Sequence, residues 1–198
     1  MDYKKKTIES YNQNAKELSE KFKGLMDLKK RYEFQRFIDL LEGTKVLDLG
    51  CGAGDHSLYF KEMGLDVTAV DLSAEMIRLC KEKGLNASVK DIENLDFENN
   101  SFDGVWTVTS LLHIPKSKLK KVIEKLDLIL KNEGILYLCV KEGEGEKWVN
   151  DRFGSRFFAF WKEDEIKKLF EDYFVPIENK KVQLGNTVFL QVFFKKRH

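Results

Sequence analysis

Short apolar runs alternate along the middle of the chain with segments whose apolar positions recur at helical spacing. The runs have the length of buried strands, and each segment between them carries one apolar face, as a helix packed on a sheet does. This alternation is typical of a doubly wound α/β fold with a mostly parallel sheet. The predicted strands are 46–49, 66–70, 87–90, 102–109 and 135–141, and the predicted helices between them are 55–63, 74–83 and 116–130.

The two ends of the chain depart from this alternation. Before the first strand, apolar residues recur at helical spacing, and Gly43 is placed to end the second of two helices. After the fifth strand, two strand-like runs are separated by a short turn, which predicts an antiparallel hairpin. The elements expected here are helices at 4–22, from about 25 to 41 and at 162–173, strands at 174–183 and 187–195, and an irregular segment at 142–160.

The most informative stretch is Val46–Gly54, with the sequence VLDLGCGAG, in which a buried strand runs directly into three glycines. Side chains at these glycines would block the approach of a ligand to the backbone or require a strained positive φ. The helix that follows offers unpaired N–H groups at its start. Because Asp55 comes next, the spacing lacks the third glycine of the dinucleotide-binding fingerprint. A nicotinamide-dependent oxidoreductase is therefore disfavoured.

Three acidic residues stand at the ends of three predicted strands. Asp48 lies two residues before the first glycine, Asp71 closes the second strand and Asp91 closes the third. Since the carboxyl ends of parallel strands meet at one edge of a sheet, these carboxylates should surround one crevice. Such a crevice repels a pyrophosphate and suits a ligand that carries an ammonium, a sulfonium and a ribose diol.

These residues resemble the motifs of the class I S-adenosylmethionine (SAM)-dependent methyltransferases. VLDLGCGAG is similar to the first motif of that family, and VTAVDLS, ending at Ser73, to the second. The core motifs resemble the small-molecule enzymes of ubiquinone and menaquinone biosynthesis, and the resemblance runs from residue 46 onward. It implies a single methyltransferase domain over 1–198, with a seven-stranded Rossmann-like core at 44–198 that ends in an antiparallel hairpin. An N-terminal helical lid at 1–43 would cover the cofactor.

The resemblance also assigns roles around the cofactor. The three glycines would wrap the methionine part of SAM, Asp48 would orient this loop, and Asp71 would accept hydrogen bonds from both ribose hydroxyls. The alternative is that Asp71 and Asp91 only cap turns, and that Tyr11 of the lid packs a helix instead of touching ligand. The implied cofactor-binding residues are Asp48, Gly50, Gly52, Gly54, Asp71, Leu72, Met76, Asp91, Ile92 and Tyr11.

Methyl transfer from a sulfonium has a neutral leaving group, so it needs an aligned acceptor and, for some acceptors, a base. His113 follows the fourth strand, where pockets lie in open α/β sheets, and is the candidate base. A histidine that only shapes this loop by bonding a backbone carbonyl is an equally good interpretation. His56 is expected to cap or pack near the cofactor.

The segment after the fifth strand is the expected source of substrate choice. Arg152 and Arg156 are candidates for binding an anionic group of the acceptor. Each of them could instead pair with neighbouring glutamates, and the aromatic residues around them could belong to the core. Trp161 is expected to be a core residue. Arg31 of the lid could touch ligand, but a solvated arginine is the favoured interpretation.

Composition narrows the alternatives. The net charge is +1, with hydrophobic residues at 42% and charged residues at 34%, so we expect a soluble globular protein without a nucleic-acid or membrane partner. The three cysteines have no zinc spacing and favour a reducing, cytoplasmic setting, and no metal site is expected. Two alternatives to a small-molecule methyltransferase stay open, namely a methyltransferase that acts on protein or RNA and a non-catalytic SAM-binding protein.

Overall fold

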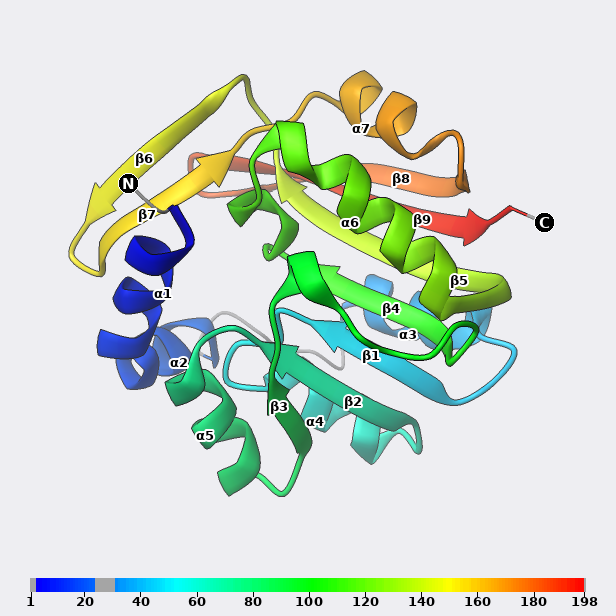
Figure 1. Cartoon of the computed structure of the whole chain (residues 1–198), viewed down its shortest axis with the longest axis horizontal. Helices are drawn as coiled ribbons and strands as arrows, with labels where there is room; N and C mark the ends of the chain where they lie inside the picture. Colours follow the sequence, from blue (N-terminus) through cyan, green and yellow to red (C-terminus); the bar gives the residue numbers. More distant parts are fainter. Residues whose placement is uncertain (1–2, 24–30, 198) are drawn as a thin grey trace.

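The computed structural model describes residues 3–23 and 31–197, which form a seven-stranded sheet covered by helices, with a separate two-stranded hairpin beside it (Figure 1). The strand order is β3-β2-β1-β4-β5-β9-β8. Strands β1 to β5 are parallel, whereas β9 and β8 run antiparallel at one edge. The strands are β1 Lys45–Leu49, β2 Asp66–Asp71, β3 Asn86–Val89, β4 Phe102–Val108, β5 Leu130–Lys141, β6 Glu146–Asp151, β7 Gly154–Ala159, β8 Phe174–Leu184 and β9 Thr187–Lys196.

The helices cover both faces of this sheet. In Figure 1, α6 crosses in front of the strands and α3 and α4 lie behind them, which explains why the strands read as nearly continuous apolar runs. Alternate residues of β1 point to opposite faces of the sheet. Leu47 packs in the hydrophobic cluster that includes residues of α6, and Val46 packs in the cluster that includes residues of α3. The helices are α1 Tyr3–Gln13, α2 Ala15–Lys23, α3 Tyr32–Leu40, α4 Asp55–Glu62, α5 Ala74–Glu82, α6 Lys116–Ile129 and α7 Glu163–Phe170, with 3₁₀ turns η2 Ile92–Asn94 and η3 Leu111–His113.

The expected doubly wound fold with a mostly parallel seven-stranded sheet and a C-terminal hairpin is confirmed. The expectation of an irregular segment at 142–160 is wrong, because β6 and β7 form an antiparallel hairpin there. One strand of this hairpin is almost wholly exposed, so its sequence lacks the apolar alternation that marks a strand. The first predicted helix is divided at Asn14 into α1 and α2. Part of the second, residues 24–30, lies outside the described residues.

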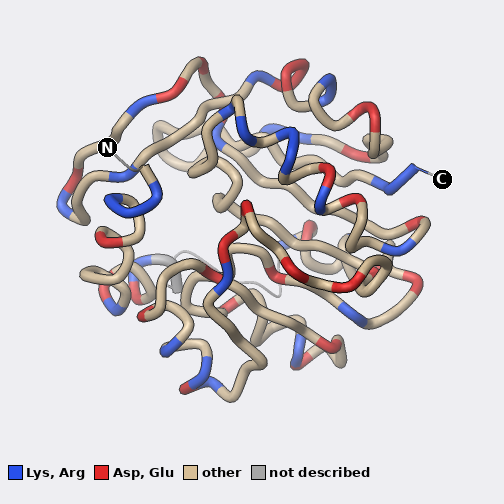
Figure 2. The backbone as a smooth tube through the Cα atoms, viewed as in Figure 1, with Lys and Arg blue, Asp and Glu red and all other residues tan. Residues whose placement is uncertain are grey.

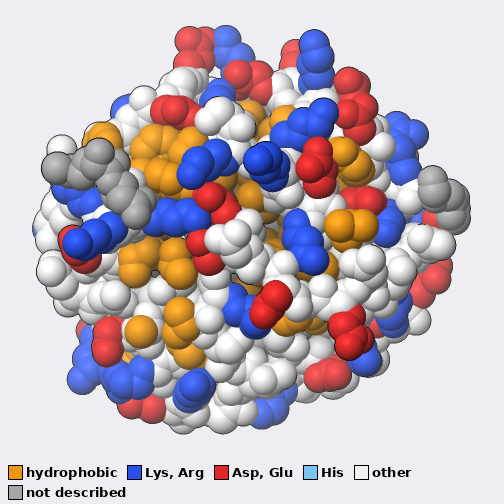
Figure 3. Space-filling view, viewed as in Figure 1, with side chains coloured by type: hydrophobic (Ala, Val, Ile, Leu, Met, Phe, Trp, Pro, Cys, Tyr) orange, Lys and Arg blue, Asp and Glu red, His pale blue; other side chains and the backbone are white. Residues whose placement is uncertain are grey.

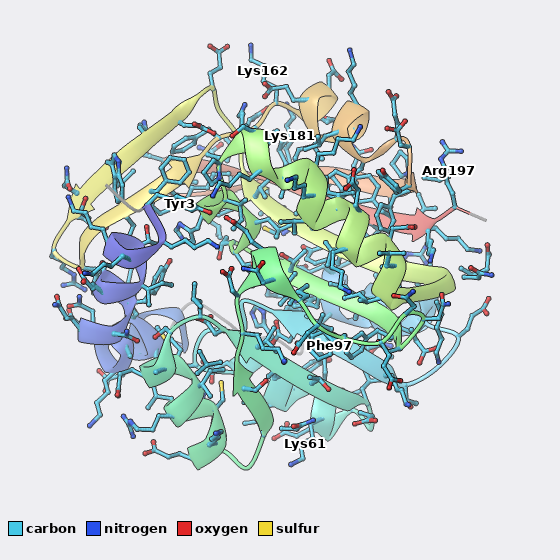
Figure 4. The ribbon with its side chains drawn as sticks, viewed as in Figure 1. Tyr3, Lys61, Phe97, Lys162, Lys181 and Arg197 are labelled. Atoms are coloured by element: carbon cyan, nitrogen blue, oxygen red, sulfur yellow. The ribbon has the colours of Figure 1, made fainter. Side chains whose placement is uncertain are left out.

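The hairpin and α1 lie together at the carboxyl ends of the parallel strands. Figure 4 shows Tyr3 at the start of α1 beside β7, where its ring is 5.5 Å from that of Phe157. The Thr7 hydroxyl accepts a hydrogen bond from the Phe157 N–H at 3.1 Å. Residues far apart in sequence are thereby joined over the edge of the sheet where the three acidic residues end their strands.

Charged side chains of both signs are distributed over the molecule. Figure 2 shows lysine and arginine interspersed with aspartate and glutamate on most elements. Within the part of the chain that the structure describes, no helix is long and apolar enough to cross a bilayer. Nor do the described residues bring together three or more histidine, cysteine, aspartate or glutamate side chains that could hold a metal ion.

Candidate active site

The glycine loop joins β1 to α4 in a conformation that side chains would not tolerate. Gly50 has a φ of +76°, and a Cβ there would lie 2.2 Å from the Cβ of Ser110. Gly52 has a φ of +54°, yet a Cβ there would meet nothing within 4 Å. Gly50 is therefore needed for the fold, because a side chain there would clash with Ser110. Gly52 instead leaves its backbone accessible from the pocket, where a side chain would cover it.

Asp71 holds this loop from the neighbouring strand. Its Oδ2 accepts a hydrogen bond from the Gly52 N–H at 2.9 Å, and its Oδ1 accepts one from the Ser73 N–H at 2.8 Å. Burial raises the pKa of this carboxyl, against the effect of these backbone donors. Each carboxylate oxygen has a second lone pair, so Asp71 can still accept two further hydrogen bonds from a ligand.

Asp48 is nearly inaccessible at 2% exposure and lies behind the same loop. Burial raises its pKa to about 7, although the Ser57 hydroxyl donates a hydrogen bond to Oδ2 at 2.5 Å. Its carboxyl therefore changes charge near neutral pH, at the base of the glycine loop.

Asp91 ends β3 and already has several partners. It caps η2 by accepting from the Glu93 N–H, and it accepts from the Lys4 ammonium at 2.6 Å. Burial acts to raise the pKa of Asp91, but the hydrogen bond from Lys4 holds it below its ordinary value. Asp91 thus caps a turn in this structure, and the lysine brings α1 to the third acidic strand end.

Tyr11 of α1 and His113 of η3 form a hydrogen-bonded pair. His113 Nδ1 lies 2.6 Å from the Phe157 carbonyl oxygen, which can only accept, so Nδ1 carries the ring proton. His113 Nε2 therefore accepts from the Tyr11 hydroxyl, 2.8 Å away. Burial lowers the pKa of His113 to about 4 and raises that of Tyr11 to about 12, so both groups are neutral near pH 7.

One pocket of about 300 Å³ connects these groups, which is at the small end of the range of small-molecule sites. Figure 3 shows hydrophobic side chains gathered over β7 and near α1, on the face that this figure displays. Along its lining the pocket passes from the glycine loop and the strand-end acids to the far edge of the sheet. Its lining includes Tyr11, Asp48, Gly50, Gly52, Asp71, Leu72, Met76, Asp91, Ile92 and His113 among the predicted residues.

Gly54 and the two predicted substrate-binding arginines are not among the residues that line this pocket. Gly54 starts α4 with a φ of +81° and faces Leu85 and Cys80. Arg152 is 68% exposed at the tip of the β6–β7 hairpin and pairs with Glu17 at 3.3 Å. Arg156 is buried and paired with Asp151, with its guanidinium over the Tyr11 ring. In this structure each of the two arginines therefore has an acidic partner outside the pocket lining, and their role in binding an anionic acceptor stays a prediction.

Other pocket residues were missed or misplaced by sequence reasoning. Arg31, expected to be solvated, lines the pocket and donates to Glu33 through Nε at 2.7 Å. His56 lines it too, as expected of a residue near the cofactor, and accepts from the Trp106 indole N–H at 3.0 Å. Thr109, which follows β4, has a φ of +53°, a strained value for a β-branched residue. Gln191 of β9 is a further lining residue that no sequence signal marks.

The comparisons with known proteins agree with this geometry. Residues 46–134 match the family described as "Methyltransferase domain", a range that contains the glycine loop, Asp71, Asp91 and His113. This part of the chain is therefore similar to a methyltransferase domain, and the predicted resemblance to SAM-dependent methyltransferases is confirmed.

Two curated relatives match about half of the chain. A sarcosine/dimethylglycine N-methyltransferase of Aphanothece halophytica is 37% identical over 46% of this chain and 36% of its own length. A ubiquinone biosynthesis O-methyltransferase of Xanthomonas oryzae pv. oryzae is 35% identical over 50% of this chain and 43% of its own length. The chain thus covers less than half the length of either relative.

A solved structure matches nearly the whole chain. The 1,6-didemethyltoxoflavin-N1-methyltransferase of Burkholderia thailandensis, with bound 1,6-didemethyltoxoflavin and S-adenosylhomocysteine, has a TM-score of 0.68 at 21% identity. The match covers 96% of this chain and 89% of that one. The two chains therefore share one fold.

Proposed function

We propose that the protein transfers a methyl group from SAM to a small-molecule acceptor. The observation that carries this proposal is that one pocket joins the glycine loop and the strand-end acids to the Tyr11–His113 pair. The relatives named above act on small molecules. Charges of both signs are interspersed along the described backbone in Figure 2, which gives no support to a protein or RNA substrate.

The residues at the glycine-loop end fit SAM. The open space at Gly52 leaves backbone for the methionine part to lie against, and the spare lone pairs of Asp71 suit the two ribose hydroxyls. Leu72 and Met76 would flank the adenine, while Asp91 and Ile92 would meet its edge. Asp48, when ionised, would favour the ammonium group. SAM supplies the methyl group on a positively charged sulfur.

The Tyr11–His113 pair would act at the reacting end of the pocket. Nε2 of His113 accepts a hydrogen bond from the Tyr11 hydroxyl, and both side chains line the pocket. A proton that leaves the acceptor can pass to the Tyr11 oxygen while the Tyr11 proton moves to Nε2. For an acceptor that has no proton to lose, His113 fixes the position of the Tyr11 hydroxyl, which can then hold the acceptor by a hydrogen bond.

The contacts of α1 support the N-terminal lid, and the free cysteines support a reducing location for the protein. Residues 1–43 act as the lid and 44–198 as the cofactor-binding core of one domain, because Lys4, Thr7 and Tyr11 of α1 line the pocket. The free thiols of Cys51, Cys80 and Cys139 support the cytoplasm as the location.

The test is the formation of S-adenosylhomocysteine from SAM by the purified protein. A cell extract is divided by ultrafiltration into a small-molecule fraction and a macromolecular fraction, and each is offered as the source of acceptor. Product formation with the small-molecule fraction alone is the expected result. Product formation only with the macromolecular fraction would replace the proposal by a protein or RNA methyltransferase, and none with either would leave a SAM-binding protein without catalysis.

A further inference from the structure

The part of the pocket farthest from the glycine loop is formed by the antiparallel edge of the sheet. Val108, Cys139 and Gln191 lie in one row across β4, β5 and β9, and Phe189 pairs with Val182 across β9 and β8. Residues opposite each other on neighbouring strands share a face, as do residues two apart on one strand. Val108, Cys139, Gln191, Phe189, Val182 and Leu184 therefore form one continuous surface of the pocket, which we name the edge wall.

This edge wall is apolar apart from one amide. Five of its six side chains are valine, cysteine, phenylalanine or leucine, and Leu184 at the tip of the β8–β9 hairpin is 56% exposed. The nearest charges are paired, because Arg31 donates to the buried carboxylate of Glu33. A charged ligand group placed here would lose water without gaining an opposite charge of its own.

Gln191 supplies the single polar feature of the edge wall. Its side chain is 3% exposed and its Nε2 donates to Glu33 Oε1 over a long 3.5 Å. Its Oε1 is buried and has no hydrogen-bond partner among the described residues. Since a carboxylate can only accept, this bond assigns the amide nitrogen to Glu33 and leaves the oxygen as the acceptor. Oε1 is therefore the atom of this amide left to accept a hydrogen bond from a donor in the pocket.

We propose that the edge wall is the acceptor subsite, and that it selects an uncharged, mainly apolar molecule whose O–H or N–H group donates to Gln191 Oε1. Ligand atoms here are in the same pocket as the glycine loop, so acceptor and cofactor would occupy opposite ends of one cavity. That the ligand bound here is a methyl acceptor rests on the proposed function. The binding preference of the edge wall can be measured without any methyl transfer.

The experiment is an NMR titration with three para-substituted toluenes, 4-methylphenol, 4-methylanisole and 4-methylbenzoate. Each titration is made with and without saturating S-adenosylhomocysteine. The phenol has the donor, the anisole has lost it, and the benzoate carries a charge. We expect 4-methylphenol to bind about tenfold more tightly than either of the others. Gln191→Leu should reduce phenol binding to the level of the anisole and leave the anisole unchanged.

Gln183→Leu is the matched control, because this glutamine is exposed on the adjacent strand β8 and lies outside the pocket lining. It should keep the wild-type preference. The proposal is overturned if wild-type protein binds phenol and anisole equally, prefers the benzoate, binds none of the three, or keeps its preference in Gln191→Leu. Failure of S-adenosylhomocysteine to bind would instead count against the proposed function, while the probe titrations still decide the edge wall.

Discussion

The Tyr11 hydroxyl donates a hydrogen bond to Nε2 of His113 over 2.8 Å, although 102 positions separate the two residues in the chain. This contact joins the first helix to the loop after β4, at the end of the sheet where the acidic residues lie. The opposite ring nitrogen is held by the Phe157 carbonyl of β7. The lid, the core and the β6–β7 hairpin therefore meet at one imidazole.

We expect Tyr11→Phe and His113→Ala each to slow turnover by about a hundredfold, the usual range for losing a proton-transfer group. If the two residues act as one unit, the double variant should be no slower than the slower single variant. SAM affinity should change by less than about fivefold, since one neutral hydrogen bond is lost. Rate losses that multiply would show independent roles, and loss of SAM binding in His113→Ala would make that residue structural.

Asp71→Asn should weaken SAM binding by about 2 kcal/mol, because a neutral amide cannot replace a carboxylate that accepts two ribose hydroxyls. Asp66→Asn is the control, since Asp66 is exposed at the opposite end of the same strand. Calorimetric titration measures both variants. If Asp71→Asn and the wild type bind SAM with equal affinity, the ribose hydroxyls do not bind Asp71.

A pair of glycine variants separates backbone strain from cofactor contact. Gly52 and Gly84 have φ values of +54° and +70°, and a Cβ at either meets nothing within 4 Å. Gly52→Ala and Gly84→Ala should therefore cost a similar 1–2 kcal/mol or so of stability, measured by urea unfolding. Only Gly52→Ala should also lower SAM affinity, by about tenfold or more, since only Gly52 lines the pocket. Equal SAM affinity in the two variants would contradict the assigned role of the loop.

Much of this arrangement follows from the sequence, and the reason is the parallel sheet. Strands buried on both faces appear as apolar runs, and their carboxyl ends meet at one edge, so Asp48, Asp71 and Asp91 could be placed together from their positions alone. Ser73 caps α5 by accepting from the Met76 N–H, as a serine before a helix commonly does.

The parts that sequence reasoning missed depend on contacts between distant segments. Gln191 reaches the pocket because the register of β9 sets it opposite Cys139, and no local pattern fixes that register. Arg152 and Arg156 were candidates for binding an anion because arginine suits anions, but sequence alone could not show that Glu17 and Asp151 lie beside them. The β6–β7 hairpin was hidden because one of its strands is solvated.

Asp48 predicts a pH dependence of stability. Its pKa is about 7 in the folded protein and about 3.9 in an unfolded chain, so between these values the folded state binds more protons than the unfolded one. Stability should therefore fall as pH rises from about 4 to 7, and Asp48→Asn should flatten this decline. Urea unfolding of both proteins at several pH values is the measurement. Parallel curves for the two proteins would show that Asp48 is ionised throughout.

The central claim is that this pocket binds SAM, and calorimetric titration with SAM, S-adenosylhomocysteine and NADH tests it most directly. The structure and its glycine spacing lead us to expect micromolar binding of the first two, with no heat from NADH. Binding of NADH, or of none of the three, would contradict the account, and the glycine loop would then serve another nucleotide or the fold alone.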